Sequence, residues 1–77
     1  LYYILKMKKD TIHIFINGNK SQVNVNHRLS DLLNYLDVDI NSVAIELNKE
    51  VIPKSKYNTI KLNINDKIEV VHFIGGG

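Results

Sequence analysis

The chain has 77 residues, of which 44% are apolar and 23% are charged, and its formal net charge is +2. This composition indicates one globular domain, and a chain of this length has room for one small core and little room for a buried active-site cavity. The sequence contains no cysteine, which excludes disulfides, thiolate zinc sites and cysteine nucleophiles.

The first ten residues are expected to form an N-terminal extension to a domain over residues 11–73. The apolar stretch Leu1–Leu5 is far shorter than the roughly 20 apolar residues that span a bilayer. Three lysines near the N-terminus form the only basic cluster, whereas nucleic-acid-binding domains concentrate basic residues on one face or helix. We therefore expect neither a nucleic-acid partner nor a membrane segment.

A β-hairpin is predicted next. In Thr11–Gly18 the isoleucines alternate with His13 and Phe15, which places the isoleucines on one face of a strand and the two aromatic rings on the other. Asn17 and Gly18 are a two-residue hairpin signal, because both tolerate positive φ. Lys20–His27 forms the returning strand, with Val23 and Val25 alternating with polar residues.

A short helix is predicted over Leu29–Val38. Its leucines recur at the spacing of one helical stripe, and they are Leu29, Leu32, Leu33 and Leu36. Ser30 is the expected N-cap, and Asp31 places a negative charge at the positive end of the helix dipole. A helix of two to three turns is not stable alone, so its stripe must pack on the sheet.

The second half of the chain is predicted to be mostly strand. Ser42–Asn48 alternates as a third strand, and Pro53 excludes a central strand directly after the following turn. Lys54–Leu62 is expected to hold a short helical turn and a minor strand. The last strand is Lys67–Phe73, with Ile68 and Val70 facing inward.

These elements predict an α+β domain with one main helix on one face of a mixed sheet of four to five strands. A hairpin, a crossing helix and a C-terminal strand in the centre of the sheet resemble the β-grasp, or ubiquitin-like, roll. Residues 74–77 would follow the domain as a flexible glycine-rich tail.

The remaining residues fit no catalytic pattern. The histidines, His13, His27 and His72, have no metal-ligand spacing, and no serine lies in a nucleophile-elbow context. We expect no metal site, no bound cofactor and no catalytic residues, so the chain is not predicted to be an enzyme.

The tail, Ile74 to Gly77, is the feature that needs an explanation. Three glycines form the thinnest possible thread, and the tail could reach about 13 Å beyond the domain. Such a thread can enter a narrow slot in a partner and present a terminal carboxylate there. A frayed terminus without function is the alternative, and the tail alone does not decide between the two.

The residues before the tail favour a functional tail. Glu46–Gly77 resembles the C-terminal half of ThiS, the sulfur carrier family of thiamine biosynthesis, and weaker similarity extends upstream to residue 11. The matching features are the stretch from Asn48 to Pro53, the acidic turn at Asp66, the strand Ile68–Phe73 and the terminal glycines. One departure is Asn65, which stands where the family commonly has glycine; asparagine also tolerates a left-handed backbone.

The resemblance implies a carrier rather than an enzyme. In that family an adenylyltransferase of the ThiF type, related to ubiquitin-activating enzymes, uses ATP to adenylate the terminal glycine. A sulfur donor such as a cysteine desulfurase then supplies a persulfide, and the resulting thiocarboxylate gives its sulfur to thiazole synthase of the ThiG type. Gly77 would bear the adenylate and the thiocarboxylate, while Gly76, Gly75 and Ile74 would lie in the partner's channel.

Partner docking is expected on the sheet face opposite the helix. Phe15, Val71 and Phe73 are apolar at positions whose strand parity points away from the core, although some of them could instead cover a core edge. The expected location is the cytoplasm, with the plastid stroma as the alternative.

Three other functions stay open at this stage. The small subunit of molybdopterin synthase has the same fold and a thiocarboxylate, but a different sequence before its terminal glycines. A ubiquitin-like protein modifier would instead join Gly77 to lysines, and a plain ubiquitin-like interaction domain would not use the tail at all.

Overall fold

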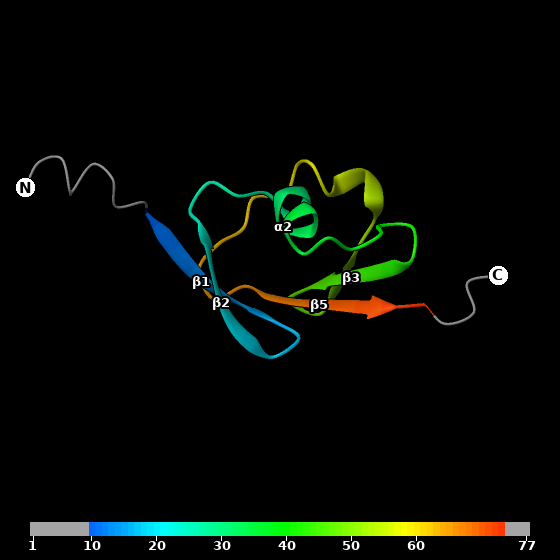
Figure 1. Cartoon of the computed structure of the whole chain (residues 1–77), viewed down its shortest axis with the longest axis horizontal. Helices are drawn as coiled ribbons and strands as arrows, with labels where there is room; N and C mark the ends of the chain where they lie inside the picture. The colour runs from blue at the N-terminus through cyan, green and yellow to red at the C-terminus, as the bar shows by residue number, and fades with distance from the viewer. Residues whose placement is uncertain (1–9, 74–77) are drawn as a thin grey trace, which may run out of the picture.

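The computed structural model describes residues 10–73, which form a mixed sheet covered by one helix (Figure 1). In chain order the elements are β1 (Thr11–Ile16), β2 (Asn19–Asn24), α2 (Leu29–Tyr35), β3 (Val43–Leu47), β4 (Glu50–Ile52), the 3-10 turn η1 (Lys54–Lys56) and β5 (Lys67–His72).

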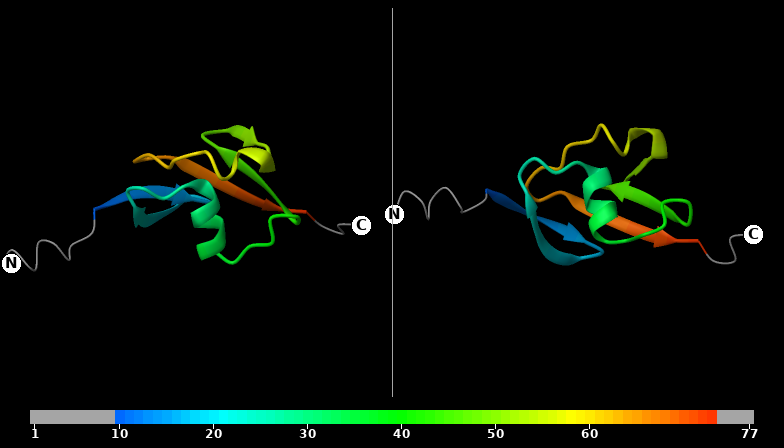
Figure 2. Two further views of the ribbon diagram at one scale, coloured as in Figure 1. Left: turned by 90° about the horizontal axis from the view of Figure 1, so that it is seen from above. Right: turned by 45° about the horizontal axis from the view of Figure 1, so that its top comes forward.

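The five strands lie in the order β2-β1-β5-β3-β4. β1 is antiparallel to β2 and parallel to β5, and β3 is antiparallel to both β4 and β5. Figure 2 shows α2 crossing one face of this sheet. The predicted α+β β-grasp architecture is confirmed, including the central position of the C-terminal strand. Because β1 and β5 are parallel, the described chain begins and ends at opposite ends of the domain (Figure 1).

The core lies between α2 and the sheet. Ile14, in the middle of β1, is fully buried, and Ile12 and Ile16 pack against the core from the same side of the strand, as predicted. The other buried apolar residues are Val23, Leu29, Leu32, Leu33, Val43, Ile45, Tyr57, Leu62, Ile68 and Val70. One apolar helix stripe and one sheet face therefore account for most of the core.

The hairpin between β1 and β2 has the predicted turn. Asn17 has a φ of 49° and Gly18 a φ of 84°, which is the left-handed conformation that a two-residue hairpin with matching twist requires. A second two-residue hairpin joins β3 to β4, with φ of 52° at Asn48 and 71° at Lys49.

Two predicted elements end early. β2 stops at Asn24 rather than at His27, because the His27 N–H donates to the Asn24 carbonyl and turns the chain, and Val25 beyond the strand is exposed. The helix stops at Tyr35 instead of Val38, because the chain takes a left-handed φ of 58° at Asp37.

The predicted N-cap was also wrong. Arg28 is the N-cap, and Ser30 lies inside the first turn of α2. The Asp31 carboxylate accepts a hydrogen bond from the Arg28 N–H at 2.9 Å, so the acidic residue at the helix start closes the turn by itself.

The minor strand lies before Pro53 rather than after it. β4 pairs with β3, and Pro53, which lacks an N–H donor, follows the last residue of β4. Between Lys54 and Leu62 the chain forms η1 and a single bridge between Arg28 and Lys61. The expected helical turn is present there, but the expected strand is not.

None of the helices in the described region, residues 10–73, is long and apolar enough to cross a membrane.

Candidate functional site

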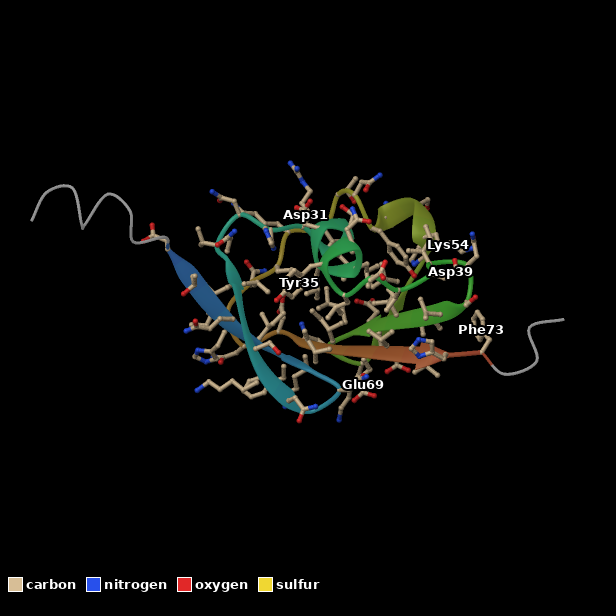
Figure 3. The ribbon with its side chains drawn as sticks, in the orientation of Figure 1. Asp31, Tyr35, Asp39, Lys54, Glu69 and Phe73 are labelled. Atoms are coloured by element: carbon tan, nitrogen blue, oxygen red, sulfur yellow. The ribbon has the colours of Figure 1, made fainter. Side chains whose placement is uncertain are left out.

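The end of β5 is the part of the fold that precedes the predicted tail. Phe73 N–H donates to the Ser42 carbonyl at 2.9 Å, so pairing with the β3 side continues one residue beyond β5. Figure 3 shows Phe73 at this end of the sheet. The predicted tail residues, Ile74, Gly75, Gly76 and Gly77, lie outside the described residues, and their roles stay predictions.

The side of β5 that faces β1 is held by Asn17. β1 ends at Ile16, and the Asn17 N–H still donates to the Ile68 carbonyl at 2.9 Å. Beyond that point the Asn17 side chain, rather than the backbone of β1, binds β5. Asn17 Oδ1 accepts from the Val70 N–H at 2.8 Å, and Nδ2 lies 3.5 Å from the Val70 carbonyl. The Asn17 amide therefore replaces one missing residue of β1.

The start of β5 is fixed by a buried carboxylate. Asp66 is 8% exposed, and it accepts hydrogen bonds from Asn48 Nδ2 at 3.0 Å and from the Asn63 N–H at 2.8 Å. Asn48 Oδ1 in turn accepts from the Lys67 N–H at 2.9 Å. Asn65 has a φ of 70°, so it takes the left-handed position that the sequence predicted for it. Asparagine side chains thus bind β5 at its first residue, Lys67, and again at Val70.

The loop before β3 supports the end of β5, where the chain leaves the sheet at Phe73. The Asp39 carboxylate accepts from the Asn41 N–H at 2.9 Å and from Ser42 Oγ at 3.0 Å. These hydrogen bonds to the charged form, in that order, lower the pKa of Asp39 below its ordinary value, and Lys54 acts in the same direction. Asp39 thereby orients Ser42, whose carbonyl binds the backbone of Phe73.

The predicted docking residues do not form one patch. Val71 is 47% exposed and Phe73 is 55% exposed, and they occupy the same face at the end of β5. Phe15 is half-buried and pairs in register with Lys67, four residues before Val71 and so about 13 Å away along the strand. Val71 and Phe73, here called the exit patch, lie together; Phe15 instead packs edge-on against His13, with ring centroids 6.1 Å apart.

Sequence reasoning missed other residues on this face. Ala44 lies opposite Val71 across β3 and β5, and the exposed Val51 of β4 lies opposite Glu46. The alternation of the third strand could have placed Ala44 and Glu46 outward. Val51 had no such signal, because β4 was interpreted as part of a connection.

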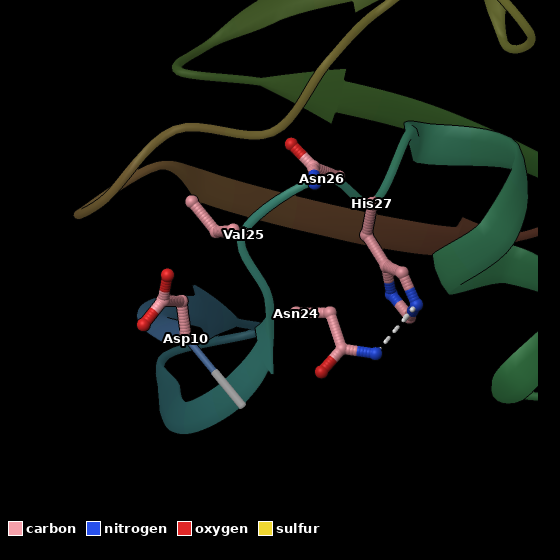
Figure 4. Close-up of a pocket in the computed structure, with 5 residues that line it drawn as sticks. All are labelled: Asp10, Asn24, Val25, Asn26 and His27. Carbon is pink, nitrogen blue, oxygen red and sulfur yellow. Dashed lines mark hydrogen bonds between the residues drawn. The ribbon is translucent and has the colours of Figure 1, made fainter. Parts of the chain in front are cut away.

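The histidines are not brought together. His13 Nε2 lies 2.8 Å from Asn65 Oδ1, whereas His27 lies in the turn after β2, with Nε2 3.4 Å from Asn24 Nδ2 (Figure 4). The pocket in Figure 4 also contains Asp10, so it offers one carboxylate and one imidazole. Across residues 10–73 no group of three potential metal-ligating side chains occurs.

Nearly the whole chain matches a known protein family. A family model described as the ThiS family matches residues 13–77. The crystal structure of the thiamine biosynthesis protein (ThiS) from Geobacter metallireducens superposes with a TM-score of 0.76 at 29% identity, covering 86% of this chain and 100% of that one.

Three relatives extend the comparison. A thiazole synthase from Paramagnetospirillum magneticum is 42% identical over 64 residues, which are 83% of this chain but only 20% of that protein. An uncharacterized protein, ycf40, from Pyropia yezoensis is 39% identical over 71 residues and is covered along its whole length. The sulfur carrier protein ThiS from Bacillus subtilis is 43% identical over 49 residues, covering 64% of this chain and 74% of the relative.

Proposed function

This chain belongs to the ThiS family, and we propose that it is a sulfur carrier protein of thiamine biosynthesis that holds sulfur as a thiocarboxylate on Gly77. The observation that carries the proposal is the family match over residues 13–77, which includes the three glycines of the tail. The similarity to the sulfur carrier from Bacillus subtilis supports it.

The proposed chemistry takes place on the Gly77 carboxyl group. A carboxylate oxygen attacks the α-phosphorus of ATP on a ThiF-type adenylyltransferase, and pyrophosphate leaves. The terminal sulfur of a persulfide then attacks the acyl carbon and displaces AMP. This step forms a carbon–sulfur bond and leaves an acyl disulfide between Gly77 and the donor cysteine. A second thiol then attacks the donor sulfur and breaks the sulfur–sulfur bond that came from the persulfide, which leaves the thiocarboxylate on Gly77 and a disulfide on the donor.

The chain itself contributes delivery and recognition to this sequence, as a group carrier does. It has no cysteine, so the persulfide and the second thiol both come from partner proteins, such as a cysteine desulfurase for the sulfur. Asp66 lies directly before β5, Asn17 binds Val70 in the second half of the strand, and the Ser42 carbonyl accepts from the N–H of Phe73, the last described residue before the tail. Gly76, Gly75 and Ile74 would occupy the channel of the partner.

Thiazole synthase is the proposed sulfur acceptor. Proteins of that name from Paramagnetospirillum magneticum and Magnetococcus marinus contain a region similar to this chain, at 42% and 41% identity, within one fifth of their length. A carrier domain and its acceptor on one polypeptide would be a permanent form of the complex that we propose here.

The plastid is the proposed location where the host has one. The relatives named ycf40 come from plastid genomes, and the example from Pyropia yezoensis is matched along its whole length.

Mass spectrometry of the protein purified from its own host tests the proposal. We expect a fraction of the chains to end in Gly77 with one carboxyl oxygen replaced by sulfur, and alkylation of the thiocarboxylate should label that residue alone. Chains that are extended beyond Gly77, or joined through it to lysine side chains, would contradict the proposal and favour a protein modifier.

A further inference from the structure

Two glutamates face each other across the central strands. Glu46 of β3 and Glu69 of β5 are direct antiparallel partners. Ile45, Ile68 and Val70 beside them are buried in the core, so both glutamates project from the opposite face of the sheet. Figure 3 shows Glu69 on β5. Like charges in directly opposed positions destabilise a sheet, because their Cβ atoms lie only about 5 Å apart.

The rest of the described chain does not neutralise this glutamate pair. Lys67 lies two positions before Glu69 on the same face of β5, yet within residues 10–73 no ion pair within 4.0 Å joins a cation to either carboxylate. Apolar residues flank the pair on its other sides: Val51 of β4 lies opposite Glu46, and Val71 follows Glu69 on β5. Two carboxylates without an ion-pair partner within 4.0 Å among residues 10–73 thus lie between the exposed side chains of Val51 and Val71.

The opposed charges lower the stability of the isolated sheet, and both carboxylates lie on the face away from the core, where a partner can reach them. Two carboxylates on adjacent strands suit a guanidinium group, whose five N–H donors are held in a rigid fork and can bind two acceptors at once. An ammonium group would act only as a point charge. Glu69 also lies on the strand that leads to the tail, two residues before Val71 of the exit patch.

Building on the proposed function, we propose that the Glu46–Glu69 pair receives an arginine side chain of thiazole synthase. The arginine would be surrounded by apolar residues that pack against Val51 and Val71. Docking at this position holds the acceptor against β5 and directs the tail into it. Binding would also remove the repulsion between the two glutamates, so part of the recognition energy is stored in the free carrier.

The test measures binding of the unmodified full chain to thiazole synthase from the same organism, by titration calorimetry, together with thermal unfolding of each variant. Glu46→Gln and Glu69→Gln each remove half of the pair. We expect either change to raise the unfolding midpoint by about 1–5 °C, because repulsion is relieved. We expect it to raise the Kd about three- to tenfold, with the difference shrinking as salt screens the charges.

Glu50→Gln is the matched control, because it removes the same charge from β4 at a position paired with Leu47 rather than with another acid. Its Kd should stay within a factor of two of the wild type. Glu69→Lys separates the effect of the pair on stability from its effect on binding. It places opposite charges across the strands, so it should stabilise the domain while weakening binding to thiazole synthase by more than tenfold.

The inference is overturned if the Glu46→Gln and Glu69→Gln variants bind as tightly as the wild type, or lose no more than Glu50→Gln. It is also overturned if these variants unfold at a lower temperature, since the pair would then be structural. A wild-type chain that forms the thiocarboxylate but does not bind thiazole synthase would overturn this inference alone. Absence of the thiocarboxylate would instead contradict the proposed function.

Discussion

The side-chain amide of Asn17 binds the backbone of Val70 where β1 has already ended. Its Oδ1 accepts from the Val70 N–H at 2.8 Å, and its Nδ2 faces the Val70 carbonyl at 3.5 Å. Val70 is paired on its other side with Ile45 of β3. One side chain from a hairpin turn therefore keeps the central strand supported on both sides as it approaches the exit patch.

Replacement of Asn17 by glycine tests this support. The turn should persist, because glycine accepts the positive φ at this position, but the amide pairing is lost. We expect a loss of about 1–2 kcal/mol in the free energy of unfolding, measured in urea, and faster hydrogen exchange at Val70. The exposed Asn26 gives a control, and Asn26→Gly should cost only a few tenths of a kcal/mol. Equal losses in both variants would contradict the assignment.

Asp66 is expected to be the most sensitive polar residue of the described fold. Asp66→Ala leaves Asn48 Nδ2 and the Asn63 N–H without their acceptor, at a cost of about 2–3 kcal/mol in the free energy of unfolding. A double-mutant cycle with Asn48→Ala, measured by chemical denaturation, should give a coupling energy of at least about 0.5 kcal/mol. Strictly additive losses would show that the two side chains act independently.

Asp39 should make the stability of the domain depend on acid pH. Its pKa is lower in the folded chain than in the unfolded one, because the charged carboxylate accepts hydrogen bonds from Asn41 and Ser42. The unfolded state therefore binds the proton more readily, and the contribution of Asp39 is present above about pH 4 and is lost as the pH falls through the folded value.

Asp39→Asn, which keeps an acceptor but no charge, should flatten this part of the curve of unfolding midpoint against pH. An unchanged acid slope in Asp39→Asn would assign the slope to other carboxylates.

The exit patch is expected to bind a partner rather than to stabilise the fold. Val71→Lys or Phe73→Lys should weaken binding to the adenylyltransferase or to thiazole synthase by at least tenfold, since a charge would be buried in the interface. The unfolding midpoint should change little, because both side chains are about half exposed. Ile64 is as exposed as Phe73, and Ile64→Lys provides the control. A midpoint that falls in parallel with the affinity would defeat this assignment.

Most of the fold followed from local signals in the sequence. The isoleucines of β1 alternate, the leucines of α2 recur with helical spacing, and Asn17-Gly18 is a strong turn signal, so these elements were predicted correctly. The errors lie where tertiary contacts or competing turns determine where an element begins or ends. Arg28 became the N-cap because the Asp31 carboxylate reaches back to its N–H, and β4 formed before Pro53 because the turn at Asn48 and Lys49 returns the chain onto β3.

The site could be predicted only in part. Strand parity correctly placed Val71 and Phe73 on an exposed face. It could not show that Phe15 lies at the far end of β5, since that distance depends on the parallel register with Lys67. The hydrogen bonds by which Asn17 and Asn48 hold β5 in place could not be predicted either, because their partners lie 53 and 18–19 residues away in the sequence.

Intact-mass measurement after reconstitution tests the central claim most directly. The purified chain would be incubated with ATP, a persulfide source and the adenylyltransferase of the same organism, with a chain lacking Gly76 and Gly77 as the control. We expect one oxygen to be exchanged for one sulfur at Gly77 only when all components are present, and no change in the shortened chain. An unchanged mass with an adenylyltransferase that is demonstrably active would contradict the sulfur-carrier account.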